Sequence, residues 1–241
     1  MRAYWQDSRA PRYSLLFALP LFILYQILEA LAPPDAGGGL RNGADVILQT
    51  LFTRIAGSRG PWLFLACLVG AGLWLVVRDL RGHNRDLRLL VFALMLAEAA
   101  LLALLFGGVV SLITSEILHA TAVVSQAPIA RLGPQTRVML SLGAGLYEEL
   151  LFRVLLVGTL AWAGRRLLGF RPFVAGLWAA LLGALVFAAF HYIGPYGDRF
   201  EAYSFVFRTI AGLAFSALYL VRGFGITAWT HALYDMFLLL R

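Results

Sequence analysis

Long runs of apolar residues limit what this chain can fold into. The longest, residues 89–118, is almost unbroken. The chain is 61% hydrophobic and only 14% charged, whereas roughly a quarter of the residues of a soluble domain are charged. A water-soluble fold could not cover so much apolar surface. The sequence therefore predicts an all-α, polytopic transmembrane helical bundle.

Seven segments are predicted to cross the membrane, namely residues 13–32, 61–77, 89–118, 137–163, 173–192, 203–221 and 226–240. Residues 46–55 are mildly amphipathic and too short to cross, so we predict an interfacial helix there. Residues 89–118 are too long for one straight crossing, because at ~1.5 Å per residue they exceed a hydrocarbon core of ~30 Å. This run is expected to tilt, to protrude or to break near Gly107 and Gly108. We expect about seven to eight spans in total.

The predicted spans form one integral bundle with two parts. Residues 1–136 hold the N-terminal spans and the interfacial helix, and residues 137–241 form a core that carries the sequence motifs described below. The single Cys67 lies within an apolar run, where packing is its expected role. One cysteine provides neither a disulfide framework nor a cysteine-based metal site.

The basic residues indicate a membrane topology. The net charge is +7, and all 20 basic residues are arginine, as is typical of a GC-rich bacterial genome. Most flank the apolar runs, where they contact lipid headgroups, so the charge does not indicate a nucleic-acid partner. Placing the N-terminus inside puts eleven arginines inside and seven outside. We therefore expect a protein of the bacterial inner membrane with a cytoplasmic N-terminus and membrane lipids as partners.

Three charged residues interrupt the fourth predicted span. The stretch 146–155 reads L-Y-E-E-L-L-F-R-V-L and contains Glu148, Glu149 and Arg153. Charges at membrane depth are costly and usually mark function. On a helix, Glu149 and Arg153 are four residues apart and are expected to form an ion pair. Glu148 is turned about 100° away from that pair, so this arginine does not neutralise it and its carboxylate is available for acid–base chemistry.

Two later segments supply histidines. They read F-A-A-F-H, from Phe187 to His191, and H-A-L-Y-D, from His231 to Asp235. A carboxylate four residues from an imidazole can fix its tautomer and orientation. Two chemical interpretations stay open: Glu148 acts as a base while His191 holds the water, or Glu148, His191 and His231 bind a divalent metal such as Zn.

The three segments in this order resemble the motifs of a known family. E-E-L-L-F-R, F-A-A-F-H and H-A-L-Y-D are similar to the E-E-x-x-x-R, F-x-x-x-H and H-x-x-x-N/D motifs of the CPBP intramembrane proteases. That family includes CAAX-prenyl endopeptidases and bacteriocin-processing or immunity proteins. The similarity covers about residues 137–240 of the chain. It implies an intramembrane endopeptidase that hydrolyses a peptide bond of a membrane-associated protein or peptide substrate.

The resemblance also implies roles for individual residues. Glu148 would be the catalytic glutamate, and His191 would help it to activate water. His231 and Asp235 would line the oxyanion side of the site, although Asp stands where the CAAX enzymes typically have Asn, and an ionised Asp cannot donate a hydrogen bond. Relatives are described both as metalloproteases and as glutamate-dependent enzymes, so we expect either no cofactor or one divalent metal. The supporting residues are Glu149, Arg153 and Phe187.

A non-enzymatic interpretation uses the same residues. A bacteriocin-immunity factor, a scaffold or a proton-coupled transporter could employ them as a polar network or relay. Neither H-E-x-x-H nor G-x-S-G occurs, so zinc and serine intramembrane proteases of those types are not indicated. Glu98 and Arg208, inside the third and sixth predicted spans, are expected to form structural pairs or to make a cavity polar. Counting along the spans places His191 and His231 at different depths, although they must lie at similar depth to cooperate.

Overall fold

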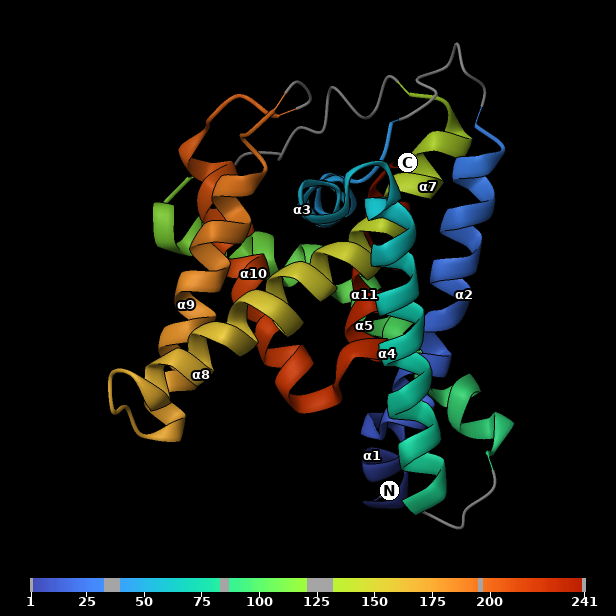
Figure 1. Ribbon diagram of the computed structural model, residues 1–241. Coiled ribbons are helices and arrows are strands. Elements are labelled where there is room, and N and C mark those ends of the chain that lie inside the picture. Colours follow the sequence, from blue (N-terminus) through green and yellow to red (C-terminus); the bar gives the residue numbers. More distant parts are fainter. Residues whose placement is uncertain (1, 33–39, 83–86, 121–131, 195–196, 240–241) are drawn as a thin grey trace.

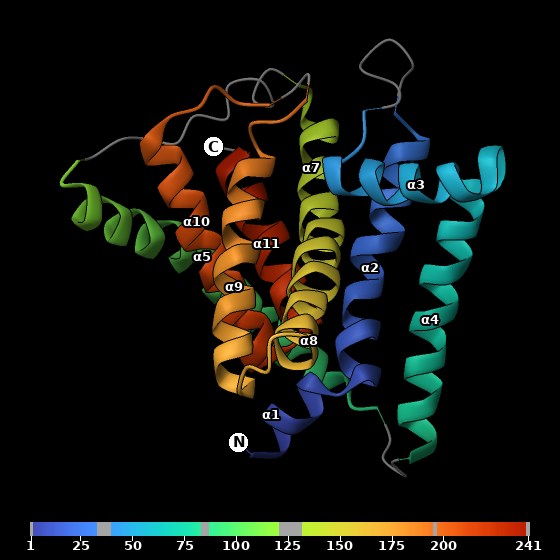
Figure 2. The ribbon, with the colours of Figure 1, turned by 60° about the vertical axis from the view of Figure 1, so that its left-hand side comes forward.

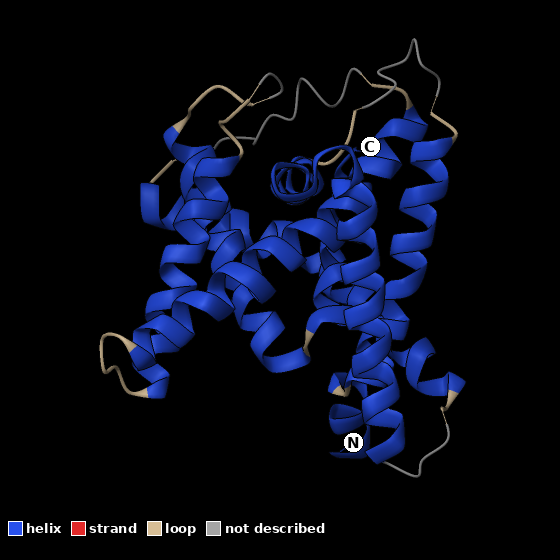
Figure 3. Cartoon of the chain, viewed as in Figure 1, coloured by secondary structure: helices blue, strands red, loops and turns tan. Residues whose placement is uncertain are grey.

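The described part of the chain is helical throughout. The computed structural model describes residues 2–32, 40–82, 87–120, 132–194 and 197–239, and these contain helices, turns and loops but no strand (Figures 1 and 3). The predicted connections at 33–45, 78–88 and 119–136 fall partly outside these residues. The all-α prediction is confirmed.

The elements alternate long helices with short connections. The N-terminal elements are α1 (Arg2–Arg9), α2 (Pro11–Ala30), α3 (Gly43–Ala56), the 3-10 turn η2 (Gly57–Arg59), α4 (Gly60–Gly82) and α5 (Leu89–Leu118). They are followed by α7 (Pro134–Gly143), η3 (Ala144–Val157), α8 (Gly158–Arg166), α9 (Pro172–Phe190), α10 (Ala202–Arg222) and α11 (Phe224–Leu239). Proline lies in the first turn of α2, α7 and α9, where its missing N–H costs no hydrogen bond.

The described residues contain five helical stretches that are long and apolar enough to cross a membrane. They are Pro11–Ala30, Gly43–Gly82, Leu89–Leu118, Pro172–Phe190 and Ala202–Arg222. The two other predicted spans differ from these: the continuous helix from α7 to α8 carries charged residues in its middle, and α11 has only 16 residues. The span count is roughly that predicted.

Helix α3 lies across the bundle. Figures 1 and 2 show it running across the direction of α2 and α4, at the end of the molecule opposite the N-terminus. Its Val46 and Leu51 side chains are exposed, as expected for a helix at the membrane interface. The helix is longer than the predicted 46–55, and it begins within the predicted loop 33–45. The reason is Asn42, whose side chain caps α3.

Helix α5 adapts to its length by tilting. It is continuous through Gly107 and Gly108, so the predicted break does not occur. Figures 1 and 2 show it running obliquely across the bundle, inclined to α2 and α4. Phe106 stacks on Phe215 of α10 with a centroid distance of 4.2 Å, and its ring lies 5.1 Å from that of Tyr234 in α11. An inclined helix can place 30 residues against a hydrocarbon core that one straight crossing would exceed.

Helix α11 is short because it begins inside the fold. Gly223, with φ of 80°, ends α10, and α11 starts at the next residue. The buried Arg222 donates two hydrogen bonds to Glu98 of α5, at 2.6 and 2.7 Å. Tyr4 of α1 donates to the same carboxylate at 2.5 Å, so Glu98 forms the expected structural pair and α1 contacts the turn. His231 therefore lies about two turns into a helix that starts within the protein.

Candidate active site

The segment with the charged residues is a π-helix. η3 (Ala144–Val157) continues α7 and leads into α8 without a break. Such wide turns are rare, and short π-helical segments are frequent at functional sites. Glu148, Glu149 and Arg153 are buried, with 7%, 0% and 1% of their surface exposed. Because buried charges persist only when they are paired, their partners define the site.

Glu149 binds two cationic or ionisable side chains. Its Oε2 lies 3.2 Å from Arg153 Nε, so the predicted ion pair is present. Its Oε1 lies 2.7 Å from His231 Nδ1, and this contact fixes the orientation of the imidazole. Asp235 lies near the other ring nitrogen, with its Oδ2 3.7 Å from His231 Nε2.

Arg153 is held between two aromatic rings. Its guanidinium carbon lies 4.4 Å from the centroid of Phe187 and 5.4 Å from that of Phe215. Its Nη2 donates a hydrogen bond of 3.5 Å to the Gly212 carbonyl oxygen. Cation–π attraction is strongest where water is excluded. Arg153 therefore links η3 to α9 and α10, which carry these partners.

His231 presents its Nε2 to two carboxylates. This nitrogen lies 3.7 Å from Asp235 Oδ2 and 4.0 Å from Glu148 Oε2. The imidazole also stacks on Phe215, with a centroid distance of 4.4 Å and an angle of 20° between the rings. Because the ring is held by this stacking and by Glu149, Nε2 has a defined position beside Glu148.

His191 lies directly after the end of α9 and reaches the same region. Its Nδ1 lies 2.8 Å from the Phe187 carbonyl oxygen, and its ring lies 4.8 Å from the Phe187 ring. The Phe187 ring is also 6.2 Å from that of His231, so the two imidazoles flank one aromatic ring and lie at similar depth. His191 interacts electrostatically with Glu148. The span boundaries predicted different depths for His191 and His231, but the two side chains lie beside the same aromatic ring.

Close approach of η3 and α11 depends on Gly145. A Cβ atom at this position would lie 2.3 Å from the Ala228 carbonyl oxygen and 2.7 Å from the Ala232 Cβ. Both contacts are on the helix that carries His231. The absence of a side chain at Gly145 therefore allows the two helices to bring Glu149 and His231 into contact.

A further residue of the site comes from the N-terminal half of the chain. Asn42 Nδ2 donates a hydrogen bond of 2.9 Å to Glu148 Oε1, and both residues are buried. Asn42 is not among the predicted site residues, because it falls in the predicted connection 33–45. An asparagine just before an amphipathic segment predicts a helix N-cap, but it does not predict which distant side chain the amide will contact.

The second oxygen of Glu148 has a different environment from the first. Oε2 is buried and has no hydrogen-bond partner among the described residues. Buried polar atoms without a partner are uncommon and call for a physical explanation. Here one oxygen accepts a hydrogen bond from Asn42 while the other lies 4.0 Å from His231 Nε2.

A divalent metal held by Glu148, His191 and His231 was the alternative prediction for this site. His191 Nδ1 contacts the Phe187 carbonyl oxygen and His231 Nδ1 contacts Glu149, so each imidazole has only Nε2 for another ligand. Within the described residues, no three His, Cys, Asp or Glu side chains are grouped so that they could hold a metal ion. Metal dependence stays a prediction for experiment.

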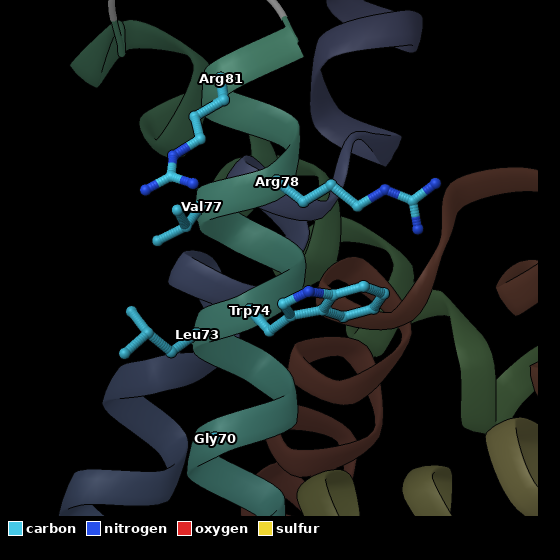
Figure 4. Close-up of a pocket in the computed structure, with 6 residues that line it drawn as sticks. All are labelled: Gly70, Leu73, Trp74, Val77, Arg78 and Arg81. Carbon is cyan, nitrogen blue, oxygen red and sulfur yellow. The ribbon is translucent and has the colours of Figure 1, made fainter.

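The groove in Figure 4 is separate from the cluster of motif residues around Glu148, which is formed by η3, His191 and α11. It lies on α4 near the end that is close to the N-terminus, and it contains no motif residue. Trp74 and Arg78 point to one side of α4, and the Arg78 guanidinium lies 5.3 Å from the Trp74 ring centroid. Aromatic and basic side chains at a helix end are typical of the lipid headgroup region. The lining residues are Gly70, Leu73, Trp74, Val77, Arg78 and Arg81.

One family model matches part of the chain. Residues 134–237 match the family model described as type II CAAX prenyl endopeptidase Rce1-like. The match includes every motif residue of the cluster and leaves α1 to α5, with Asn42, outside it. The resemblance predicted from the three motifs is confirmed over this region. No curated protein and no solved structure gives a significant match.

Proposed function

We propose that this integral membrane protein, whose residues 134–237 match the type II CAAX prenyl endopeptidase Rce1-like family model, hydrolyses a peptide bond in a membrane-associated protein or peptide. The observation that carries the proposal is Glu148, with one oxygen held by Asn42 and the other buried without a hydrogen-bond partner among the described residues. A fixed carboxylate with one available oxygen, close to His191 and His231, is suited to take a proton from water.

In the proposed mechanism, Glu148 is the general base and then the general acid. Its Oε2 takes a proton from a water molecule that His191 Nε2 helps to position, and the water oxygen bonds to the scissile carbonyl carbon. The carbonyl π electrons move to the carbonyl oxygen, which becomes the oxyanion. When the intermediate breaks its C–N bond, Glu148 returns the proton to the leaving nitrogen. The products are a new carboxyl terminus and a new amine.

His231 is proposed to stabilise the oxyanion. When its ring carries both protons, Nδ1–H donates to Glu149 and Nε2–H is available beside Glu148. Asp235, at 3.7 Å from Nε2, is proposed to favour this protonated ring. An ionised Asp235 cannot itself donate to an oxyanion, so in this chain the donor is the imidazole.

No step of this mechanism uses a metal, and we propose metal-free catalysis with Glu148 as the base. Wild-type protein in proteoliposomes is expected to cleave at least one member of a peptide panel, made of a farnesylated CAAX peptide and several single-span membrane peptides, with products identified by mass spectrometry. Cleavage is expected to persist after treatment with EDTA and 1,10-phenanthroline. Loss of activity that added Zn²⁺ restores would contradict the metal-free mechanism. An uncleaved panel together with proton flux into the liposomes would favour a transporter instead.

The position of the cluster also leads to a proposal about topology. Asn42, which contacts Glu148, caps α3 at the end of the bundle opposite the N-terminus (Figures 1 and 2). The arginine bias favours a cytoplasmic N-terminus. We therefore propose that the site is nearer the extracytoplasmic face, so that the substrate presents its cleaved bond on that side.

Cysteine labelling tests this orientation. In a Cys67→Ser background, Ser58→Cys, in the turn between α3 and α4, and Arg166→Cys, at the end of α8, place single exposed thiols at opposite ends of the bundle. A membrane-impermeant maleimide is expected to label the first variant on intact cells and the second only after permeabilisation. The reverse pattern would show that the site faces the cytoplasm.

A further inference from the structure

We infer that Asn42, from the half of the chain outside the family match, is a positioning residue for Glu148. The inference rests on the proposed function, because it assigns Asn42 to the orientation of the general base. Its Nδ2 donates to Glu148 Oε1 at 2.9 Å across a sequence separation of 106 residues. Asn42 is 7% exposed and Glu148 is 7% exposed, so water competes little for this hydrogen bond.

The oxygen and the nitrogen of the Asn42 side-chain amide each form a hydrogen bond. Oδ1 accepts a hydrogen bond of 2.9 Å from the Ala44 backbone N–H and so caps α3, while Nδ2 donates to Glu148. Ser and ionised Asp can provide the capping acceptor. Ionised Asp has no donor, and the single Ser hydroxyl is one bond closer to the backbone, so it cannot take the places of both Oδ1 and Nδ2. Of these three residue types, only asparagine can cap the helix and orient the glutamate at the same time.

A buried network holds Asn42 in place. The Asn42 backbone N–H donates to Tyr25 Oη at 3.2 Å, and this hydroxyl donates to Asp45 Oδ2 at 2.9 Å. Arg41 Nε donates to the same Asp45 oxygen at 2.7 Å. Tyr25 and Asp45 are both 0% exposed. The amide is therefore supported from α2 and from the first turn of α3, and both helices lie outside the family match.

The start of α3 also contacts the end of α9, where His191 lies. A Cβ atom at Gly43 would lie 2.9 Å from Phe190 Cζ, so α3 and α9 pack closely just beside Asn42. Phe190 precedes His191, and its ring lies 5.4 Å from that of Phe152 in η3. The beginning of α3 thus contacts two of the elements that carry motif residues. This position explains how a residue of the N-terminal half reaches the base.

Substitutions at Asn42 separate capping from positioning. Asn42→Ser and Asn42→Asp keep the cap and remove the donor to Glu148, whereas Asn42→Ala removes both. With the panel peptide that wild-type protein cleaves fastest, kcat is expected to fall roughly 10–100-fold in Asn42→Ser, as for other residues that orient a functional side chain. KM is expected to stay near the wild-type value. Asn42→Asp should be at least as impaired, because it places a second carboxylate beside Glu148.

A capping role alone predicts a different result. In that case Asn42→Ser and Asn42→Asp would retain wild-type kcat and only Asn42→Ala would be impaired, which would overturn the inference. The proposed function fails separately, if Glu148→Gln retains activity. A measurement without substrate complements the assay: thermal midpoints of Asn42→Ser, Glu148→Ala and the double variant should be non-additive. Additive shifts would show that the two side chains do not interact.

Discussion

Replacing Glu148 by Gln is expected to lower kcat for peptide cleavage by roughly 10²–10⁴-fold, the range that general acid–base catalysis contributes. Gln has nearly the same shape, and its amide oxygen can still accept from Asn42 Nδ2, so the position of the side chain is preserved. What is lost is an oxygen that can take a proton from water. KM should change little, because the substitution removes a group that acts in the transition state. Steady-state kinetics on the fastest-cleaved panel peptide measure both parameters.

Glu116→Gln is the matched control for this variant. Glu116 is an exposed glutamate near the end of α5 and does not belong to the cluster. Its replacement is expected to leave kcat and KM unchanged. Cleavage at the wild-type rate by Glu148→Gln would exclude Glu148 as the base. A cellular phenotype that survives in folded Glu148→Gln would favour the immunity or scaffold interpretation.

The contacts in the site that could be predicted from the sequence join residues that are close together in the chain. Glu149 and Arg153 pair because they are four residues apart on one helix, and this spacing is visible in the sequence. Glu148 was expected to avoid that pair, and its oxygens indeed contact other groups. The bundle could be predicted for a similar reason, since apolar runs must become helices in lipid.

The contacts in the site that could not be predicted join segments that are far apart in the sequence. The contact from Asn42 to Glu148 joins α3 to η3, and no periodicity in either segment encodes it. Glu149 rather than Asp235 binds His231 Nδ1, because the glycine at 145 lets η3 and α11 approach. The hydropathy pattern also does not reveal the π-helical turns of η3, because the pattern is interpreted with the spacing of an α-helix. The division of the bundle into residues 1–136 and 137–241 stays a prediction.

The predicted difference in depth between His191 and His231 also failed because it depended on how distant segments pack. Span boundaries were counted from apolar runs, as if each helix began at a membrane surface. Helix α11 instead begins at a turn inside the protein, where Arg222 pairs with Glu98. A charged pair that is satisfied by the fold allows a helix to start at a buried residue, and His231 and His191 then lie beside the same Phe187 ring.

Arg153→Met is expected to destabilise the protein by roughly 3–5 kcal/mol, the cost of removing one partner from a buried ion pair. Met has a similar length but carries no charge. The substitution leaves the fully buried Glu149 with His231 alone, and it also removes the cation–π contacts to Phe187 and Phe215. The fraction of monodisperse protein that remains after heating in detergent, measured by size-exclusion chromatography, reports the loss.

The double variant Glu149→Gln/Arg153→Met tests whether the loss comes from an uncompensated charge. Removing the carboxylate charge as well is expected to recover most of the thermal stability, because a buried pair replaced on both sides can be nearly neutral in free energy. Peptide cleavage should stay low in the double variant, since a neutral amide no longer favours the protonated His231 ring. If Arg153→Met were as stable as wild type, or if the second substitution lowered stability further, the pair would not be what holds η3 against α9 and α10.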